Sequence, residues 1–197
     1  MRQNISPITW YGYWTKLDMK KYILLLFLTN LSFSYSQINP KDVEIVRDSF
    51  GVPHIYGKTD ADVAYGLAWS HAEDDFKTIQ QGYLAGNGLL SKHIGINGAG
   101  ADFLTQLIES KETVDKLFGT LDPDFVKIIE AYSQGLNKYA ETHPNEILEK
   151  KLFPITPKKM TAYSFLQLFI ANEADKLVLS IINNKVPREN PFIDDIK

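Results

Sequence analysis

The sequence predicts an α+β fold that is mostly helical and carries one β-hairpin. Residues 43–56 alternate apolar and polar side chains on both sides of a turn, which is the pattern of two short strands with one buried face. From residue 59 onward, apolar residues recur at steps of three and four in several longer segments, which places them on one side of a helix. These two periodicities predict a hairpin followed by about four helices.

The composition is that of an ordinary globular domain. Of the 197 residues, 44% are hydrophobic and 23% are charged, so the chain is long enough for one domain with its own core. The net charge of −3 excludes the Lys and Arg surplus that a nucleic-acid-binding protein needs, and we expect no nucleic-acid partner. The chain contains no cysteine, which excludes disulfides, thiolate zinc sites and a cysteine nucleophile.

Residues 1–36 have the features of a targeting region. Met19-Lys20-Lys21 supplies a basic start, residues 22–28 form a short apolar run, and Ser34-Tyr35-Ser36 supplies small residues before a cut. The run is shorter than the roughly 20 residues needed to span a bilayer. We therefore predict a signal peptide at about 19–36, cleaved near Ser36, no stable membrane span, and export to the periplasm or the cell exterior. The alternatives are an uncleaved anchor or a buried helix, and Met19 competes with Met1 as the start of translation.

The first strand of the expected hairpin is Val43–Arg47, and Val52–Tyr56 is the return strand after a turn at Asp48–Gly51. Pro53 cannot donate to a sheet ladder, so it confines the return strand to an edge or a bulge. Two strands alone are only marginally stable. We therefore expect the hairpin to belong to a sheet that is completed by something outside this chain.

The first helix is expected to start at a capping box, in which Thr59 and Asp62 satisfy free N–H groups of the first turn. Glycines from Gly82 to Gly88 are expected to end this helix, and those from Gly95 to Gly100 predict a loop. A second helix is expected over Asp102–Phe118, with Gly119 as its stop. The inward residues of the two helices are predicted to be Tyr65, Trp69, Ala72, Phe76, Ile79 and Tyr83, and then Phe103, Leu107, Val114 and Leu117.

Asp122-Pro123 is a strong N-cap and first-turn pair, and it opens a third helix that ends near His143-Pro144. After a loop marked by prolines, a fourth helix is expected over Thr161–Asn183. The tail, residues 187–197, has the composition of a linker or spacer. The apolar face of the third helix is Phe125, Ile128, Ile129, Tyr132, Leu136 and Tyr139, and that of the fourth includes Phe165, Leu168, Phe169, Leu177 and Ile181.

These residues do not by themselves identify a reaction. The histidines are scattered without metal-ligand spacing and without an adjacent nucleophile, so we expect a structural hydrogen-bonding role for His54. The acidic triplet Glu73–Asp75 could bind a hard cation, but adjacent helical positions diverge around the axis, which favours a solvated helix face. The glycine-rich stretches lack a phosphate-loop ending, and no serine lies in a Gly-x-Ser-x-Gly turn.

A long ordered set of motifs lies between Val46 and Phe76: Arg47-Asp48, Gly51–Gly57, Asp60-Ala61-Asp62, Tyr65-Gly66 and Ala72–Asp75. This set resembles the opening of the penicillin acylase family, which includes penicillin, cephalosporin and acyl-homoserine-lactone acylases and belongs to the N-terminal-nucleophile hydrolases. Weaker similarity continues to about Asn183 and includes Ala131–Asn137, which looks like the family's Tyr-x-x-Gly-x-Asn helix. Within the family, the motifs look closest to the acyl-homoserine-lactone and aculeacin acylase branch.

The resemblance implies a precursor that cleaves itself into an α chain, a spacer and a β chain. Residues 37–186 correspond to the α-chain region, and the β chain would be its heterodimer partner in a four-layer αββα fold. The nucleophile would be the serine that becomes the first residue of the β chain. Its own α-amine, with a peptide pKa of about 7.7–8.0, can act as the base, and β-chain donors would hold the oxyanion. The resemblance therefore assigns no catalytic residue to this chain.

By the same resemblance, the last α-chain helix lines the acyl pocket, which places Glu173, Lys176 and Leu177 at a substrate-binding site. The alternative is that Leu177 belongs to the core and that the two charges are solvated. No cofactor is required, but some family members bind calcium between the chains with a glutamate at about the position of Asn183. An asparagine offers a carbonyl oxygen without a charge.

We therefore expect the α-chain part of an exported amidohydrolase that acts on linear N-acyl amides. The resemblance implies small-molecule substrates such as N-acyl-homoserine lactones, acylated peptides or β-lactam side chains, and a role in antibiotic metabolism or quorum quenching. The competing hypothesis is a truncated fragment without catalysis that acts at most as an interaction module.

Overall fold

A computed structural model of the protein describes residues 37–183 and residue 185. The predicted targeting region, residues 1–36, and the predicted linker, residues 187–197, lie outside these residues, and both stay predictions. The chain divides into two units between Gln37 and Ile38, and the fold described below is that of the second unit.

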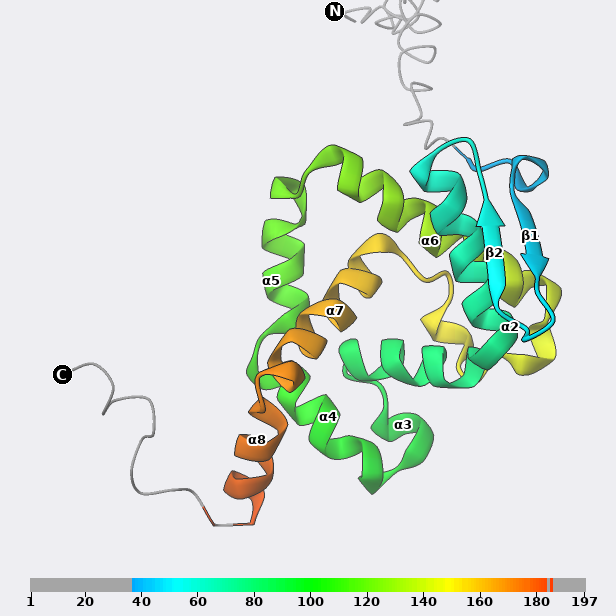
Figure 1. The fold of residues 1–197 in the computed structure, drawn as a ribbon. Helices are drawn as coiled ribbons and strands as arrows, with labels where there is room; N and C mark the ends of the chain where they lie inside the picture. The colour runs from blue at the N-terminus through cyan, green and yellow to red at the C-terminus, as the bar shows by residue number, and fades with distance from the viewer. Residues whose placement is uncertain (1–36, 184, 186–197) are drawn as a thin grey trace, which may run out of the picture. The chain divides into compact units, whose positions relative to one another are not determined.

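The described fold is mostly helical with one two-stranded antiparallel hairpin, which confirms the secondary-structure content expected from the sequence (Figure 1). In chain order the elements are η2 Pro40–Asp42, β1 Glu44–Arg47, β2 Pro53–Tyr56, α2 Asp60–Gly86, α3 Ser91–Ile94, α4 Ile96–Leu107, α5 Ser110–Leu117, η3 Phe118–Thr120, α6 Pro123–Thr142, η4 Pro144–Glu146, η5 Lys150–Leu152, α7 Pro157–Ala171 and α8 Ala174–Ile182.

The hairpin forms where the sequence predicts it and lies against α2. Ile45 pairs with Ile55 in the register of the two strands. Both side chains lie over Gly66 of α2, where an added Cβ would come within 2.6 Å of the Ile55 Cγ2 atom. The glycine therefore lets the hairpin approach the helix closely. The opposite face of the hairpin carries Val46 and Tyr56, which are exposed.

The start of α2 confirms the predicted capping box. The Thr59 hydroxyl accepts from the Asp62 backbone N–H at 3.2 Å, and the Asp62 carboxylate accepts from the Thr59 N–H at 3.0 Å. The helix contains a break at Asp75 (φ −158°, ψ 73°), whose carboxylate accepts from the Thr78 N–H at 3.0 Å and so caps the second half. The helix ends at Gly86, within the Gly82–Gly88 stretch that was expected to end it.

The main core lies between α2 and α6 and is closed by the segment that leads to α7. Gly135 of α6 touches α2 so closely that a Cβ would lie 2.4 Å from the Tyr65 carbonyl oxygen. Asp122 caps α6 as predicted, since its side chain accepts from the Asp124 and Phe125 N–H groups. The buried apolar residues of this core are Ala68, Ala72, Phe76, Tyr83, Leu84, Leu136, Tyr139, Ala140, Leu152 and Ile155.

The predicted loop at Gly95–Gly100 is wrong, because α4 begins at Ile96 and includes two of these glycines. Gly98 is buried, and a Cβ there would lie 2.6 Å from the Ser91 backbone nitrogen. A glycine at position 98 therefore serves close packing and does not mark a loop. Asp102, the predicted helix start, lies in mid-helix, where its carboxylate accepts from the Leu90 and Ser91 N–H groups at 2.8 Å each and fixes the start of α3.

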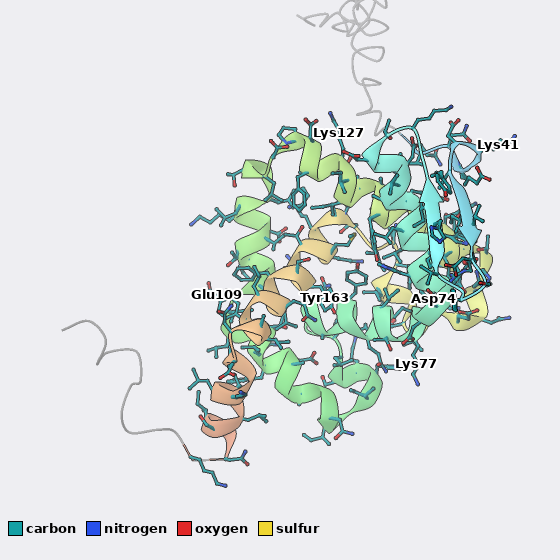
Figure 2. All side chains as sticks on the ribbon, viewed as in Figure 1. Lys41, Asp74, Lys77, Glu109, Lys127 and Tyr163 are labelled. Carbon is teal, nitrogen blue, oxygen red and sulfur yellow. The ribbon has the colours of Figure 1, made fainter. Side chains whose placement is uncertain are left out.

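Two predicted long helices are each broken into two. Glu109 (φ 49°) separates α4 from α5, and Glu173 (φ 64°) separates α7 from α8. Among the side chains predicted to face inward on α4 and α5, Val114 is buried, but Phe103, Leu107 and Leu117 are 44%, 57% and 49% exposed. The break turns α5 against α7, where the Ser110 hydroxyl donates to the Ala162 carbonyl at 3.0 Å. Figure 2 shows Glu109 at the junction and Tyr163 of α7, which lies against the C-terminal end of α2.

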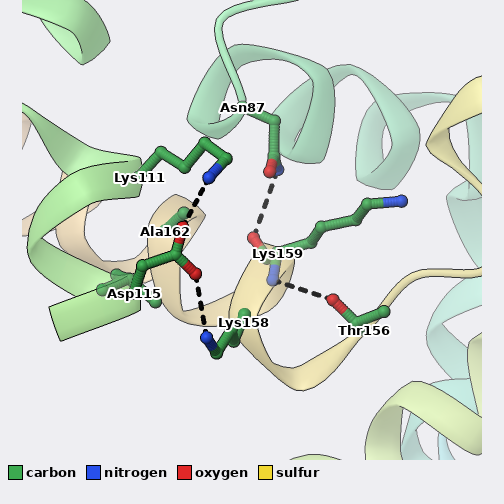
Figure 3. A pocket seen from close by; sticks show the side chains of 8 residues that line it. Asn87, Lys111, Asp115, Thr156, Lys158, Lys159 and Ala162 are labelled. Atoms are coloured by element: carbon green, nitrogen blue, oxygen red, sulfur yellow. Dashed lines mark hydrogen bonds and ion pairs between the residues drawn. The ribbon is translucent and has the colours of Figure 1, made fainter. Parts of the chain in front are cut away.

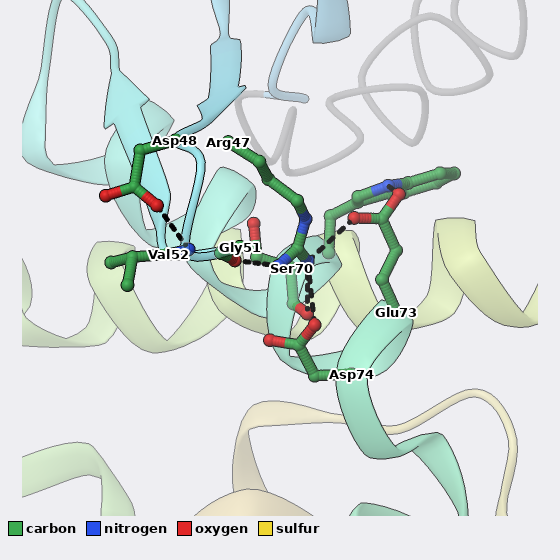
Figure 4. A network of polar contacts seen from close by, with 8 residues as sticks. Arg47, Asp48, Gly51, Val52, Ser70, Glu73 and Asp74 are labelled. Atoms are coloured by element: carbon green, nitrogen blue, oxygen red, sulfur yellow. Dashed lines mark hydrogen bonds and ion pairs between the residues drawn. The ribbon is translucent and has the colours of Figure 1, made fainter.

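Arg47, the last residue of β1, ties the hairpin to the middle of α2 (Figure 4). Its guanidinium donates to the Gly51 carbonyl oxygen at 2.8 Å and to the Ser70 carbonyl oxygen at 3.4 Å. It also forms ion pairs with Glu73 at 3.1 Å and with Asp74 at 2.9 Å. The acidic triplet is therefore not merely a solvated face, since two of its carboxylates hold the arginine.

The hairpin turn is held by Asp48 and Gly51. The Asp48 carboxylate accepts from the Val52 N–H at 3.0 Å and the Phe50 N–H at 2.9 Å, and it also contacts the His54 Nε2 atom at 3.3 Å. Gly51 has a φ of 82°, a left-handed conformation that favours glycine. His54 thus has the structural role that was expected for it.

The contact between α2 and α7 allows a direct test of the packing. We expect Gly86→Ala to destabilise the protein by about 1–3 kcal/mol, because the new Cβ would lie 2.3 Å from the Tyr163 Cα atom, on backbone that cannot rotate away. Gly100→Ala is the matched control, since Gly100 is also helical but a Cβ there has nothing within 4 Å. It should leave stability unchanged or raise it by up to about 1 kcal/mol. Urea unfolding of both variants measures this, and equal stabilities would contradict the close packing.

The hydrogen bonds to the Asp48 carboxylate in the hairpin turn predict that the protein becomes less stable in acid. The backbone hydrogen bond from Val52, with smaller contributions from His54 and Phe50, lowers the pKa of Asp48. Stability from this lowered pKa is present above the unfolded value of about 3.9 and is lost as the pH falls below it. Asp48→Asn keeps a side-chain acceptor but cannot titrate, so we expect a shallower loss of stability between about pH 5 and about pH 2. Thermal unfolding across this range measures the slope, and identical slopes for both proteins would refute the role of Asp48.

Candidate functional site

The junction of α7 and α8 holds the three residues predicted to bind substrate. Glu173 is the N-cap residue of α8 with a left-handed backbone, and its carboxylate pairs with Lys176 Nζ at 2.6 Å. Leu177 is 54% exposed, so it is not a core residue of this chain. The structure therefore brings the three residues together on one turn of α8, with an apolar side chain next to an exposed ion pair.

Apolar side chains continue over α8 and the neighbouring α4. Val178 points inward and packs with Leu104, Leu166 and Ala85 in a second, smaller core. Leu177, Leu179 and Ile181, on other sides of the same helix, stay exposed. On α4, Phe103 and Leu107 are exposed as well. The two helices therefore carry five exposed large apolar side chains: Phe103, Leu107, Leu177, Leu179 and Ile181.

Asn183 follows the last turn of α8, and the position is exposed. Its side-chain amide donates to the Leu179 carbonyl oxygen at 2.8 Å, which leaves its own side-chain oxygen available. Calcium requires six to eight oxygen ligands, usually with carboxylates among them. Within residues 37–183 and 185, no group of three or more acidic or histidine side chains could hold a metal ion. The role of Asn183 at a calcium site stays a prediction.

A cavity of about 220 Å³ lies between α5 and the start of α7 (Figure 3). Asp115 occupies its wall and is paired with Lys111 and, at 2.9 Å, with Lys158. The hydrogen bonds from these two lysines lower the pKa of Asp115 to about 2. Lys111 pairs with Asp115 within α5, whereas Lys158 lies on α7. The Lys158–Asp115 ion pair therefore connects the two helices beside this cavity.

Lys159 also lines this cavity but turns its ammonium group away from it. Its Nζ donates to the Leu152 carbonyl oxygen at 2.6 Å and to the Pro154 carbonyl oxygen at 2.9 Å, and burial lowers its pKa. The sequence patterns do not predict that these lysines lie at one cavity. The lysine and aspartate at positions 111 and 115 have helical spacing, but nothing in the sequence indicates that a lysine of α7 would join them.

The remaining acid–base candidates are engaged in structural contacts. His71 lies 2.8 Å from the Tyr132 hydroxyl, and burial raises the pKa of that tyrosine to about 12. The His143 ring stacks on Tyr139 at a centroid distance of 4.0 Å. Ser70 is fully buried in α2, and among the described residues its hydroxyl has no hydrogen-bond partner and therefore no base. These residues do not form the nucleophile, base and orienting group that acyl transfer requires.

Comparison with known proteins places this chain in a family. A family model described as penicillin amidase matches residues 42–189. The penicillin G acylase of Escherichia coli is 23% identical over 140 residues, which are 68% of this chain and 16% of that protein. The acyl-homoserine lactone acylase PvdQ of Pseudomonas savastanoi pv. phaseolicola is 24% identical over 103 residues, which are 48% of this chain and 13% of that protein.

A penicillin acylase 2 proenzyme of Pseudomonas sp. strain SE83 is 26% identical over 97 residues, which are 49% of this chain and 12% of that protein. The chain thus spans less than a fifth of the length of these curated relatives. Among solved structures, a thermostable penicillin G acylase from Alcaligenes faecalis matches with a TM-score of 0.57 at 19% sequence identity, over 67% of this chain and 74% of that chain. That likeness shows a shared fold. Because the family model covers most of the sequence, this chain belongs to the penicillin amidase family.

Proposed function

We propose that this chain is the α-chain part of an exported amidohydrolase that cleaves linear N-acyl amides into a carboxylic acid and an amine. The match of the penicillin amidase model to residues 42–189 is the observation that carries the proposal. Two matched relatives are named for the acyl compounds on which they act, penicillin G and acyl-homoserine lactones. N-acyl-homoserine lactones, acylated peptides and β-lactam side chains are the substrate classes we propose, with a role in antibiotic metabolism or quorum quenching.

The lengths of the relatives support a partner chain. The matched part of this chain is 16% of the Escherichia coli protein but 74% of the solved Alcaligenes faecalis chain. The solved chain is therefore similar in length to this one and much shorter than a whole acylase. One relative is also named as a proenzyme. We propose that a β chain from the same precursor is the heterodimer partner, that it completes a four-layer αββα fold, and that its N-terminal serine is the nucleophile.

The distribution of exposed apolar residues supports the same partner. Val46 and Tyr56 lie on the outer face of the hairpin, whose two strands are paired only with each other among the described residues. Open strand edges and apolar faces favour association with another chain. The exposed apolar side chains of α4 and α8 are further groups that a partner or substrate would cover, and we propose Glu173, Lys176 and Leu177 as the wall of the acyl pocket.

Export is proposed on the basic start, short apolar run and small residues within residues 1–36. In the part of the chain that the structure describes, no helix is long and apolar enough to cross a membrane. The proposed location is the periplasm or the cell exterior.

We expect amide hydrolysis only when this chain is produced together with the coding region that follows Lys197. Penicillin G and an N-acyl-homoserine lactone are the probes, and release of the free amine is the readout. The control replaces the first serine of the β region by alanine, which should abolish activity by removing the nucleophile. If the adjacent region encodes no such serine, or if the two chains copurify without hydrolysing either probe or an acylated peptide, the enzyme assignment fails.

Leu177 should contribute to acyl selectivity in that assembled enzyme. Leu177→Ala removes apolar contact from the proposed pocket wall, and we expect kcat/KM for a long acyl chain to fall roughly tenfold while a short acyl chain changes little, since a methylene or two is worth about 1–3 kcal/mol. Lys127→Ala is the matched control, because Lys127 is an exposed residue of α6 that pairs with Asp124. Equal effects on both acyl lengths would remove Leu177 from the pocket.

The competing function is a fragment that acts as an interaction module. It predicts that residues 37–197 alone remain soluble and monomeric. The exposed apolar side chains of the hairpin, α4 and α8 argue for aggregation of the isolated chain and for its rescue by the β region. Size-exclusion chromatography of the chain with and without the β region distinguishes the two functions.

A further inference from the structure

Gln37 stands at the boundary between the proposed signal peptide and the folded unit. The proposed cut after Ser36 would make Gln37 the first residue of the exported protein. The compact unit begins at the next residue, Ile38. A cut at this place would therefore remove nothing from the fold and would leave a single residue ahead of it.

The residues that follow Gln37 are held in place. The Ile38 backbone N–H donates to the side-chain oxygen of Gln134 on α6 at 2.9 Å, across 96 positions of sequence. The Asn39 side chain accepts from the Lys41 N–H at 3.2 Å and caps η2, and Asp42 at the end of η2 pairs with Lys58 at 2.5 Å. The new N-terminus would thus be fixed one residue beyond an anchored amide.

Gln37 itself is exposed, and its side chain makes no hydrogen bond with the described residues. Nothing in this part of the chain therefore holds its amide group away from its own backbone nitrogen. When a glutamine is the first residue, its α-amine and its Cδ carbonyl carbon are placed for a five-membered ring, and an intramolecular reaction of this kind has a large advantage over attack by a separate molecule.

We propose that Gln37 is a modification site, at which the exported chain is converted to an N-terminal pyroglutamate. The neutral α-amine attacks Cδ, a new C–N bond closes the ring, the bond from Cδ to the side-chain nitrogen breaks, and ammonia leaves with a proton from the amine. No oxidant or co-reactant is consumed. The Gln37 carbonyl and the Ile38 N–H take no part in the reaction, so the hydrogen bond to Gln134 is kept.

The modification changes the chemistry of the N-terminus. A free α-amine has a pKa of about 7.7–8.0 and is largely cationic at neutral pH, whereas the lactam has no charge. The lactam also has no primary amine, so the chain end resists aminopeptidases and Edman degradation. This inference rests on the export and cleavage in the proposed function, and it does not depend on the amidase activity.

The test uses the full-length precursor, including the β region, expressed in a host that exports it. The purified protein is digested with trypsin, and the N-terminal peptide Gln37–Lys41 is measured by mass spectrometry. We expect a peptide that is lighter by one ammonia and that pyroglutamyl aminopeptidase shortens by one residue. A synthetic peptide with the same sequence and a free amine is carried through the same steps, and any loss of ammonia from it measures the ring closure that the handling itself causes.

Gln37→Asn is the matched variant. It keeps an exposed primary amide but shortens the side chain by one methylene, so the ring would have four members and should not form. Its N-terminal peptide is expected at full mass, while secretion and amide hydrolysis match those of the unchanged protein.

The outcomes separate the two proposals. A peptide that begins at Gln37 with its full mass overturns the modification and leaves export and cleavage intact. A secreted chain that begins at another residue, or an uncleaved one, overturns the modification together with the proposed cut. Loss of amide hydrolysis alone, with a pyroglutamate still present, overturns the enzyme assignment and supports the modification.

Discussion

The close approach of α2 to its neighbours is the constraint on which the rest of this structure depends. Three positions on this arrangement admit only glycine: Gly66 under the hairpin, Gly135 on α6 against α2, and Gly86 against the backbone of Tyr163 in α7. At Gly135 and Gly86 a Cβ would meet backbone atoms, and at Gly66 it would meet the side chains of Ile55 and Val43, so these contacts fix how closely α6, α7 and the hairpin approach α2. The α7–α8 junction, which carries the candidate site, takes its position from the last of these contacts.

Ion pairs add to the close packing at the glycines. Arg47 reaches from the hairpin to Glu73 and Asp74 beside the break in α2, and the ion pair of Asp115 with Lys158 connects α5 to α7. Isolated ion pairs at an exposed surface contribute little to stability. These pairs instead specify which elements meet, because each joins two elements that are separated in the sequence. Arg47, Glu73 and Asp74, which belong to the motifs that resemble the acylase family, thus have a structural function in this chain.

The features predicted correctly from the sequence are those with a local cause. The hairpin turn, the Thr59 capping box and the Asp122 N-cap each depend on residues within a few positions of one another. The breaks at Glu109 and Glu173 have no such signal, since neither position carries a glycine or a proline, and tertiary packing of α5 and α8 determines where the helices turn. Gly98 misled the prediction because its close contact with the start of α3 at Ser91 needs a residue without a side chain, and a glycine selected for packing looks like a loop signal in the sequence.

The candidate site was partly predictable because its residues follow one another on α8, while its environment was not. Helical spacing places Glu173, Lys176 and Leu177 together, but their exposure depends on the helix break, which turns Val178 inward and leaves its neighbours outside. A chain that encloses its own active site would bury such a leucine. Here the large apolar side chains of α4 and α8 stay exposed among the described residues. The exposure of Leu177 therefore fits the proposed role of this helix as part of a pocket wall that a partner chain covers.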